Sequence, residues 1–172
     1  MRRLWAPWRM VYILQEKKGG CFFCDGLREG RDEGNLILYR GKLALVMMNR
    51  FPYNNGHVMV VPKRHCLCLE DLSDEEGQEL FHLLQVSLRV LKSSLNPDGF
   101  NVGLNLGKAA GAGEEHVHFH IVPRWVGDSN YMPVLGETKV ISECLTETYR
   151  KLRLAFERLR GGRSKGKGGR RP

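Results

Sequence analysis

The chain has 172 residues, of which 42% are hydrophobic and 27% are charged. This length predicts a single domain with a sizeable core, and the composition is that of an ordinary soluble globule. The longest apolar run, Leu43–Met48, is too short to span a bilayer, and Pro7 and Arg9 interrupt any apolar leader at the N-terminus. These features argue against a membrane-spanning or secreted protein and favour a cytoplasmic one.

The net charge of +8 is concentrated at the C-terminus. Residues 160–172 hold six basic residues and no acid, so the rest of the chain carries only +2. A segment made largely of Gly, Ser, Lys and Arg cannot build a core. We therefore predict one domain over residues 1–160 and a disordered basic tail over residues 161–172. The tail either contacts nucleic acid or an acidic partner, or is solvated without a role.

Strand and helix patterns predict an α+β domain. Ser73 and Glu76 form a capping-box pattern, and leucines at helical spacing then predict a helix from about Asp74 to Ser94. A second apolar stripe predicts a helix over residues 139–160. The predicted strands cover residues 35–40, 42–48, 56–62, 100–106 and 117–125. Their connections suit a five-stranded, mostly antiparallel sheet with two main helices packed on it.

A row of histidines in the last predicted strand is the strongest functional signal. Because side chains alternate along a strand, His116, His118 and His120 share one face, and the residues between them point into the core. The preceding segment, residues 105–115, is rich in glycine, and its backbone N–H groups can approach an anion closely. Phosphate beside an imidazole that titrates near neutrality predicts attack on phosphorus.

These motifs resemble the histidine-triad superfamily of nucleotide hydrolases and transferases. The resemblance covers about residues 20–125 and includes the segments 35–38, 46–52, 55–65 and 103–125. Residues 4–9 and 123–133 resemble a narrower branch that includes diadenosine tetraphosphate phosphorylases. The resemblance also implies a homodimer whose two sheets join into one.

The resemblance assigns catalytic roles. His118 is the expected nucleophile, which attacks the α-phosphorus of a nucleotide and passes the nucleotidyl group to phosphate or water; otherwise it is a hydrogen-bonded core histidine. His120 contacts the phosphate or fixes the tautomer of the nucleophile, and Asn105 contacts the nucleophile or the scissile phosphates. The anion loop is expected to use backbone donors only, because this chain has small residues where relatives often have Gln or Ser. That loop comprises Gly111, Ala112 and Gly113.

Further binding residues follow from the same resemblance. Asn49 is expected at the ribose hydroxyls, or else is a turn residue. Lys108 and Trp125 are expected at the distal phosphate or the leaving nucleotide. The predicted apolar slot for the base comprises Phe22, Phe23 and Met47, which are equally compatible with a core role.

Two of the five cysteines, Cys21 and Cys24, have the C-x-x-C spacing that in a cytosolic protein indicates metal or redox chemistry. Zinc prefers four N or S ligands, and the resemblance offers His65 and His116 as the other two. We therefore expect a structural zinc ion and no organic cofactor. The alternatives are two reduced thiols near a histidine pair, or ligation by Cys66 or Cys68. His57 and His82 are predicted to be structural.

Two other classes of function compete with nucleotidyl transfer. One is a zinc metallohydrolase in which the three histidines are metal ligands. The other is a zinc-stabilised nucleic-acid-binding module that uses the basic tail. The glycine-rich loop before the histidine row favours nucleotidyl transfer.

Overall fold

An antiparallel sheet of five strands organises the fold, in the order β1-β2-β3-β5-β4. The computed structural model describes residues 20–128 and 143–163. The strands are β1 (Ile37–Arg40), β2 (Ala44–Met48), β3 (Val58–Pro62), β4 (Gly99–Gly103) and β5 (Phe119–Arg124). All five strands predicted from the sequence are present, and every neighbouring pair is antiparallel. The ladders are shorter than the apolar patterns, so β5 begins at Phe119 and two of the three histidines precede it.

The two predicted helices are present, together with a third that the sequence did not predict. The helix α3 (Asp74–Leu95) begins at the predicted capping box and ends at Asn96, whose φ of 47° is left-handed. The helix α5 (Leu145–Arg163) ends three residues past the predicted boundary at residue 160, and residues 139–142 lie outside the described residues. The unpredicted helix is α2 (Phe22–Arg28). Short 3₁₀ turns, η1 (Leu69–Asp71) and η2 (Lys108–Ala110), lie in the connections.

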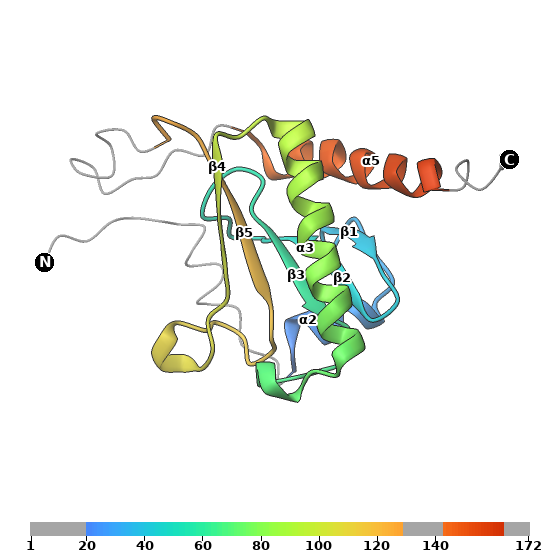
Figure 1. Cartoon of the computed structure of the whole chain (residues 1–172), viewed down its shortest axis with the longest axis vertical. Coiled ribbons are helices and arrows are strands. Elements are labelled where there is room, and N and C mark those ends of the chain that lie inside the picture. The colour runs from blue at the N-terminus through green and yellow to red at the C-terminus, as the bar shows by residue number, and fades with distance from the viewer. Residues whose placement is uncertain (1–19, 129–142, 164–172) are drawn as a thin grey trace, which may run out of the picture.

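Helices cover both faces of the sheet. The helices α3 and α5 pack on one face, where the main core contains Val46, Val60, Ile121 and Phe156 among others; α3 crosses in front of the strands in Figure 1. On the other face α2 buries Phe23 in a smaller core, whose other buried members are Ile37, Leu45, Met47, Met59 and Val61.

The sheet register places the histidine row on the α2 face. His120 pairs with Met59, which belongs to the smaller core, whereas Phe119 and Ile121 pack against the main core. The predicted alternation of histidines and core residues is therefore confirmed within β5. In the described ranges no helix is both long and apolar enough to cross a membrane.

Candidate active site and metal centre

His118 lies just before β5 and is held in one tautomer. Its Nδ1 is 2.6 Å from the backbone oxygen of His116. A carbonyl only accepts, so Nδ1 carries the proton and Nε2 keeps its lone pair. The side chain is 6% exposed, and burial lowers its pKa. His118 is thus a neutral imidazole at neutral pH, and no described residue forms a hydrogen bond with its Nε2.

A chain of hydrogen bonds also fixes the tautomer of His120. The backbone N–H of Tyr53 donates to His57 Nδ1 at 3.1 Å, so His57 carries its proton on Nε2. His57 Nε2 is 2.9 Å from His120 Nδ1 and donates to it. His120 therefore presents Nε2–H as a donor, and its ring centroid lies 4.7 Å from that of His118. Burial, with the neighbouring His118, lowers the pKa of His120 to about 4.

His57 is the site residue that the sequence did not identify. It was predicted to be structural, and it is fully buried, but its Nε2 contacts His120 of the candidate active site. The contact arises because β3 and β5 are neighbours with Met59 opposite His120. The pairing register between β3 and β5 cannot be read from the pattern of a single sequence.

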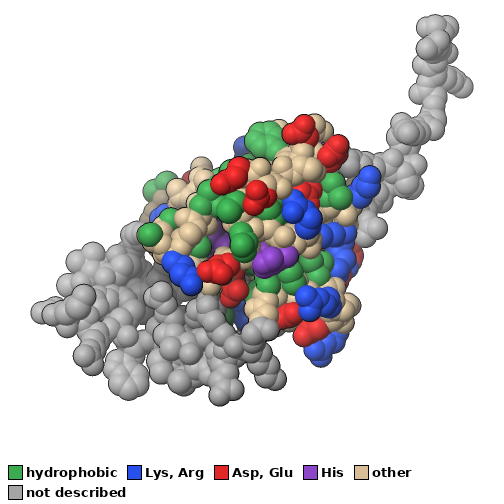
Figure 2. Space-filling view, turned by 90° about the horizontal axis from the view of Figure 1, so that it is seen from below, with side chains coloured by type: hydrophobic (Ala, Val, Ile, Leu, Met, Phe, Trp, Pro, Cys, Tyr) green, Lys and Arg blue, Asp and Glu red, His purple; other side chains and the backbone are tan. Residues whose placement is uncertain are grey.

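The four predicted metal ligands lie together, although they come from three distant parts of the chain. Their ligand atoms are within 4.8 Å of one another in the group Cys21, Cys24, His65 and His116. His116 Nδ1 is 3.2 Å from Cys21 Sγ and 3.8 Å from Cys24 Sγ, and His65 Nδ1 is 3.5 Å from Cys24 Sγ. On the face in Figure 2, histidine side chains reach the surface among acidic and basic ones.

This donor set fits zinc. Two sulfurs and two imidazole nitrogens are a preferred zinc set, and metal binding requires neutral imidazole. His116 Nε2 donates to the backbone oxygen of Pro62 at 3.0 Å, which turns the Nδ1 lone pair toward the cysteines. Burial lowers the pKa of His116 to about 4 and raises that of Cys21 to about 11 when no cation balances the thiolate.

The three triad histidines do not converge on one point. Only His116 belongs to the metal-ligand group found among the described residues. His118 and His120 direct Nδ1 at the His116 carbonyl and at His57 respectively. This geometry disfavours a metallohydrolase with all three histidines on a single ion.

The glycine-rich loop is closed by its own hydrogen bonds. The amides of Ala110 and Ala112 donate to the Gly107 oxygen, and that of Gly111 donates to the Lys108 oxygen. Gly107 and Gly111 adopt φ values of +76° and +87°, which favour glycine. Phosphate binding by Gly111, Ala112 and Gly113 stays a prediction, and for Gly111 and Ala112 it requires exchange of these internal bonds for bonds to the ligand.

Three polar residues that were predicted to bind nucleotide have local partners. Asn105 Nδ2 donates to the Gly111 oxygen at 3.4 Å, which joins the segment after β4 to the predicted anion loop. Asn49 Oδ1 accepts from the Phe51 amide at 2.8 Å, as in the turn that the sequence offered as the alternative. Lys108 is exposed and pairs with Glu115 at 3.1 Å. Their contacts with nucleotide stay predictions.

The predicted base slot is largely core. Phe23 and Met47 are 3% and 2% exposed, whereas Phe22 is half-buried beneath the guanidinium of Arg50. The Phe23 ring lies 5.3 Å from His116 and 5.0 Å from His118 between ring centroids, so it covers the histidine row. Phe22 is the member with an accessible ring.

Trp125 does not lie near His118, the predicted nucleophile. It follows the far end of β5, and at about 3.3 Å per residue it lies roughly 20 Å along the strand from His118. Its indole Nε1 donates to the Asn96 oxygen at 3.2 Å. A contact between Trp125 and the leaving nucleotide stays a prediction.

Comparison with known proteins places this geometry in a family. The HIT domain pattern matches residues 31–126. The chain is 41% identical over 167 residues to a Mycobacterium tuberculosis protein named AP-4-A phosphorylase, covering 92% of this chain and 86% of that protein. It is 37% identical over 100 residues to the bis(5'-adenosyl)-triphosphatase of Saccharomyces cerevisiae, covering 55% and 48% of the two chains.

Solved structures agree with the sequence relatives. A Zn-bound histidine triad family protein from Mycobacterium smegmatis superposes with a TM-score of 0.67 at 28% identity, covering 83% of this chain and 97% of that one. The matched domain spans more than half of the chain and contains the histidine row. The alignment with the Mycobacterium tuberculosis protein covers 92% of this chain. The chain therefore belongs to the HIT, or histidine-triad, family.

Proposed function

We propose that this protein is a nucleotidyl transferase that splits dinucleoside polyphosphates such as diadenosine tetraphosphate. His118 Nε2 attacks the α-phosphorus, and the bond from that phosphorus to the bridging oxygen breaks. With diadenosine tetraphosphate, ATP leaves and AMP remains bonded to His118. The relatives named AP-4-A phosphorylase and bis(5'-adenosyl)-triphosphatase support this substrate class.

The orientation of His118 is the observation that carries the proposal. Its Nδ1–H is bonded to a backbone carbonyl, so the opposite nitrogen is free and unprotonated. His120 Nε2–H, aligned through His57, supplies a donor beside it for the scissile phosphate or the leaving oxygen. A histidine row serving only as core packing would not need two such defined tautomers.

The second step transfers the nucleotidyl group to an acceptor. An oxygen of inorganic phosphate attacks the bound phosphorus, the P–N bond breaks, ADP forms and His118 is restored; with water the product is AMP. The relative named AP-4-A phosphorylase favours phosphate.

Product analysis with and without inorganic phosphate tests the reaction. ADP that appears only with phosphate identifies a phosphorylase, and AMP under both conditions identifies a hydrolase. Mass spectrometry after a brief incubation and acid-free quench should find one AMP on His118. Turnover without such an adduct under single-turnover conditions would contradict the covalent route.

We also propose that the group of Cys21, Cys24, His65 and His116 holds a structural zinc ion. The donor set and the compact arrangement support zinc, as does the Zn-bound relative. A bound ion would fasten α2 to the start of the β5 segment. It is assigned no part in the phosphoryl chemistry, because neither His118 nor His120 belongs to the group.

The remaining proposals concern the assembly and its surroundings. The edge strand β4 leaves residues 101–103 exposed, with Val102 at 48%, which supports a homodimer formed by pairing two such edges. Light scattering on the purified protein tests the dimer.

Free thiols in the described residues suit a reducing cytoplasm. Residues 164–172 of the basic tail lie outside the described residues, whereas residues 161–163 are the last turn of α5. Contact of the tail with nucleic acid or an acidic partner stays a prediction.

A further inference from the structure

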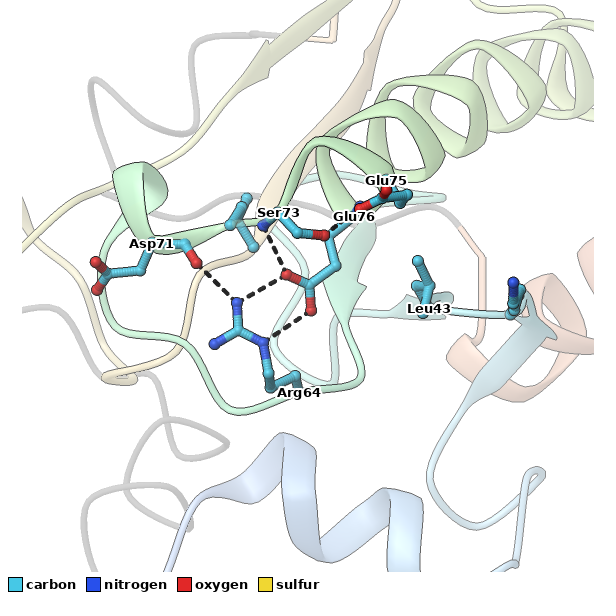
Figure 3. Close-up of a pocket in the computed structure, with 8 residues that line it drawn as sticks. Leu43, Arg64, Asp71, Ser73, Glu75 and Glu76 are labelled. Carbon is cyan, nitrogen blue, oxygen red and sulfur yellow. Dashed lines mark hydrogen bonds and ion pairs between the residues drawn. The ribbon is translucent and has the colours of Figure 1, made fainter.

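An ion pair outside the histidine site fixes the connection between β3 and α3. Arg64 Nε donates to Glu76 Oε1 at 2.9 Å, and Arg64 Nη2 donates to Glu76 Oε2 at 2.7 Å. The same Nη2 donates to the backbone oxygen of Asp71 at 2.8 Å. Figure 3 shows the guanidinium between Asp71 and Glu76. One side chain thus joins the residues after β3 to both η1 and α3.

The acidic partner is buried more deeply than the basic one. The Glu76 side chain is 8% exposed and that of Arg64 is 51% exposed. The Glu76 carboxylate also accepts from the Ser73 amide at 2.9 Å in the capping box. A buried carboxylate requires compensating partners, and a planar guanidinium supplies two parallel donors that a lysine ammonium does not reproduce. This contact fixes the place of Arg64 relative to α3.

The backbone on either side of Arg64 supports the histidine site. The Pro62 oxygen accepts from His116 Nε2 at 3.0 Å, and the Cys66 oxygen accepts from the Val117 amide at 2.8 Å. His65, next to Arg64, belongs to the cysteine–histidine group. Arg64 therefore lies in the middle of a five-residue stretch that contacts the start of the catalytic segment on both sides.

We infer that Arg64 and Glu76 are positioning residues for the active site. They hold residues 62–66 in place, so that the Pro62 and Cys66 carbonyls orient His116 and Val117. His118 is the next residue along the chain. Neither residue lies among the catalytic groups, and both act through the backbone. The effect on turnover rests on the proposed function, whereas the effect on the position of Val117 does not.

Glu76→Gln and Arg64→Lys test the inference, with Glu75→Gln as the matched control. A glutamine at position 76 can still accept from the Ser73 amide, so the capping box is kept while the charged two-point contact is lost. Glu75 is exposed and lies in the same first turn, so its change removes an equal charge from the helix start. Hydrogen exchange of the Val117 amide is measured relative to amides of the β2–β3 ladder.

We expect Val117 exchange to accelerate about tenfold relative to the ladder in Glu76→Gln and Arg64→Lys, and to stay within about twofold of wild type in Glu75→Gln. In the dinucleotide assay, kcat should fall while KM stays near its wild-type value, because binding groups are untouched. A kcat that is higher in Arg64→Lys than in Arg64→Ala would support a role of the ion pair with Glu76.

Several results would overturn the inference. Unchanged Val117 exchange in both variants would do so, and so would equal acceleration of Val117 and the ladder, which indicates general destabilisation. An equal effect of Glu75→Gln would assign the effect to the helix start. If Glu76→Gln does not fold, Arg64→Lys decides alone. Absence of turnover in the wild-type protein would refute the proposed function, and the exchange measurement would still decide the positioning role.

Discussion

Burial of His120 in its neutral form should make the stability of this protein depend on pH. The pKa of His120 is lowered from 6.5 to about 4, first by burial and then by His118. Between these two values the unfolded chain binds a proton that the folded chain excludes. Folding is therefore favoured fully above pH 6.5, and this contribution is lost as pH falls from 6.5 toward 4.

The size of the effect follows from the two pKa values. Linkage gives a loss of at most about 1.4 kcal/mol at pH 5.5 and about 2.6 kcal/mol at pH 4.5, relative to neutral pH, from this one histidine. His120→Gln removes the titrating group. The free energy of unfolding of the variant should therefore fall less steeply with acid than that of the wild type.

Urea denaturation of both proteins measures the difference. Assays at about pH 7.5, 5.5 and 4.5 cover the range in which the linkage effect develops. Both proteins keep the four candidate metal ligands, so acid-induced loss of a metal cancels in the comparison. The stability gap between the two should change by about 2 kcal/mol across the range, in favour of the variant at low pH. Parallel curves would show that His120 titrates normally in the folded protein and would refute the burial argument.

Four further outcomes are expected. His118→Ala should lower kcat by several orders of magnitude while nucleotide binding, measured by calorimetry, persists; retention of more than about a tenth of the activity would rule out His118 as the nucleophile. Cys21→Ser should reduce zinc, measured by elemental analysis, from about one ion per chain to a trace, with a lower Tm. His57→Phe should reduce kcat at least about tenfold, because His120 loses its fixed tautomer, and should destabilise the fold by about 1–3 kcal/mol in urea titration. Removal of residues 164–172, the part of the basic tail beyond α5, should leave kcat/KM on a dinucleotide unchanged; a large fall would show that this part of the tail reaches the site.

The elements with long periodic patterns were predictable from the sequence. The helix α3 has 22 residues, with apolar side chains recurring from Leu80 to Leu95 and a capping box at Ser73, so local signals suffice to define its start. In contrast, α2 has only seven residues, too few to establish a helical period. It is stabilised by packing of Phe23 against the sheet and the rings of His116 and His118, and those contacts depend on the tertiary fold.

The grouping of Cys21, Cys24, His65 and His116 was predictable from the sequence, whereas the pairing of His57 with His120 was not. The C-x-x-C spacing is a local signal that restricts the chemistry of two ligands, and family resemblance supplies the other two. His57 has no comparable local signal, because its value depends on the neighbour that it meets across the β3–β5 ladder. The register between two strands is a long-range property. Alternation along one strand predicts the side of the sheet on which a side chain lies, but it does not predict the residue opposite it on the next strand.

The three triad histidines have the same side chain and alternate regularly, yet they are suited to three different tasks. What separates them is the partner of one ring nitrogen. His116 donates from Nε2 to a carbonyl and directs Nδ1 at the cysteines, whereas His118 donates from Nδ1 and keeps the Nε2 lone pair for the proposed attack on phosphorus. His120 accepts at Nδ1 and becomes a donor at Nε2. Two of these three partners are backbone carbonyls, so the division of tasks depends on the path of the chain through residues 62–66 and 116–118 as well as on the histidines themselves.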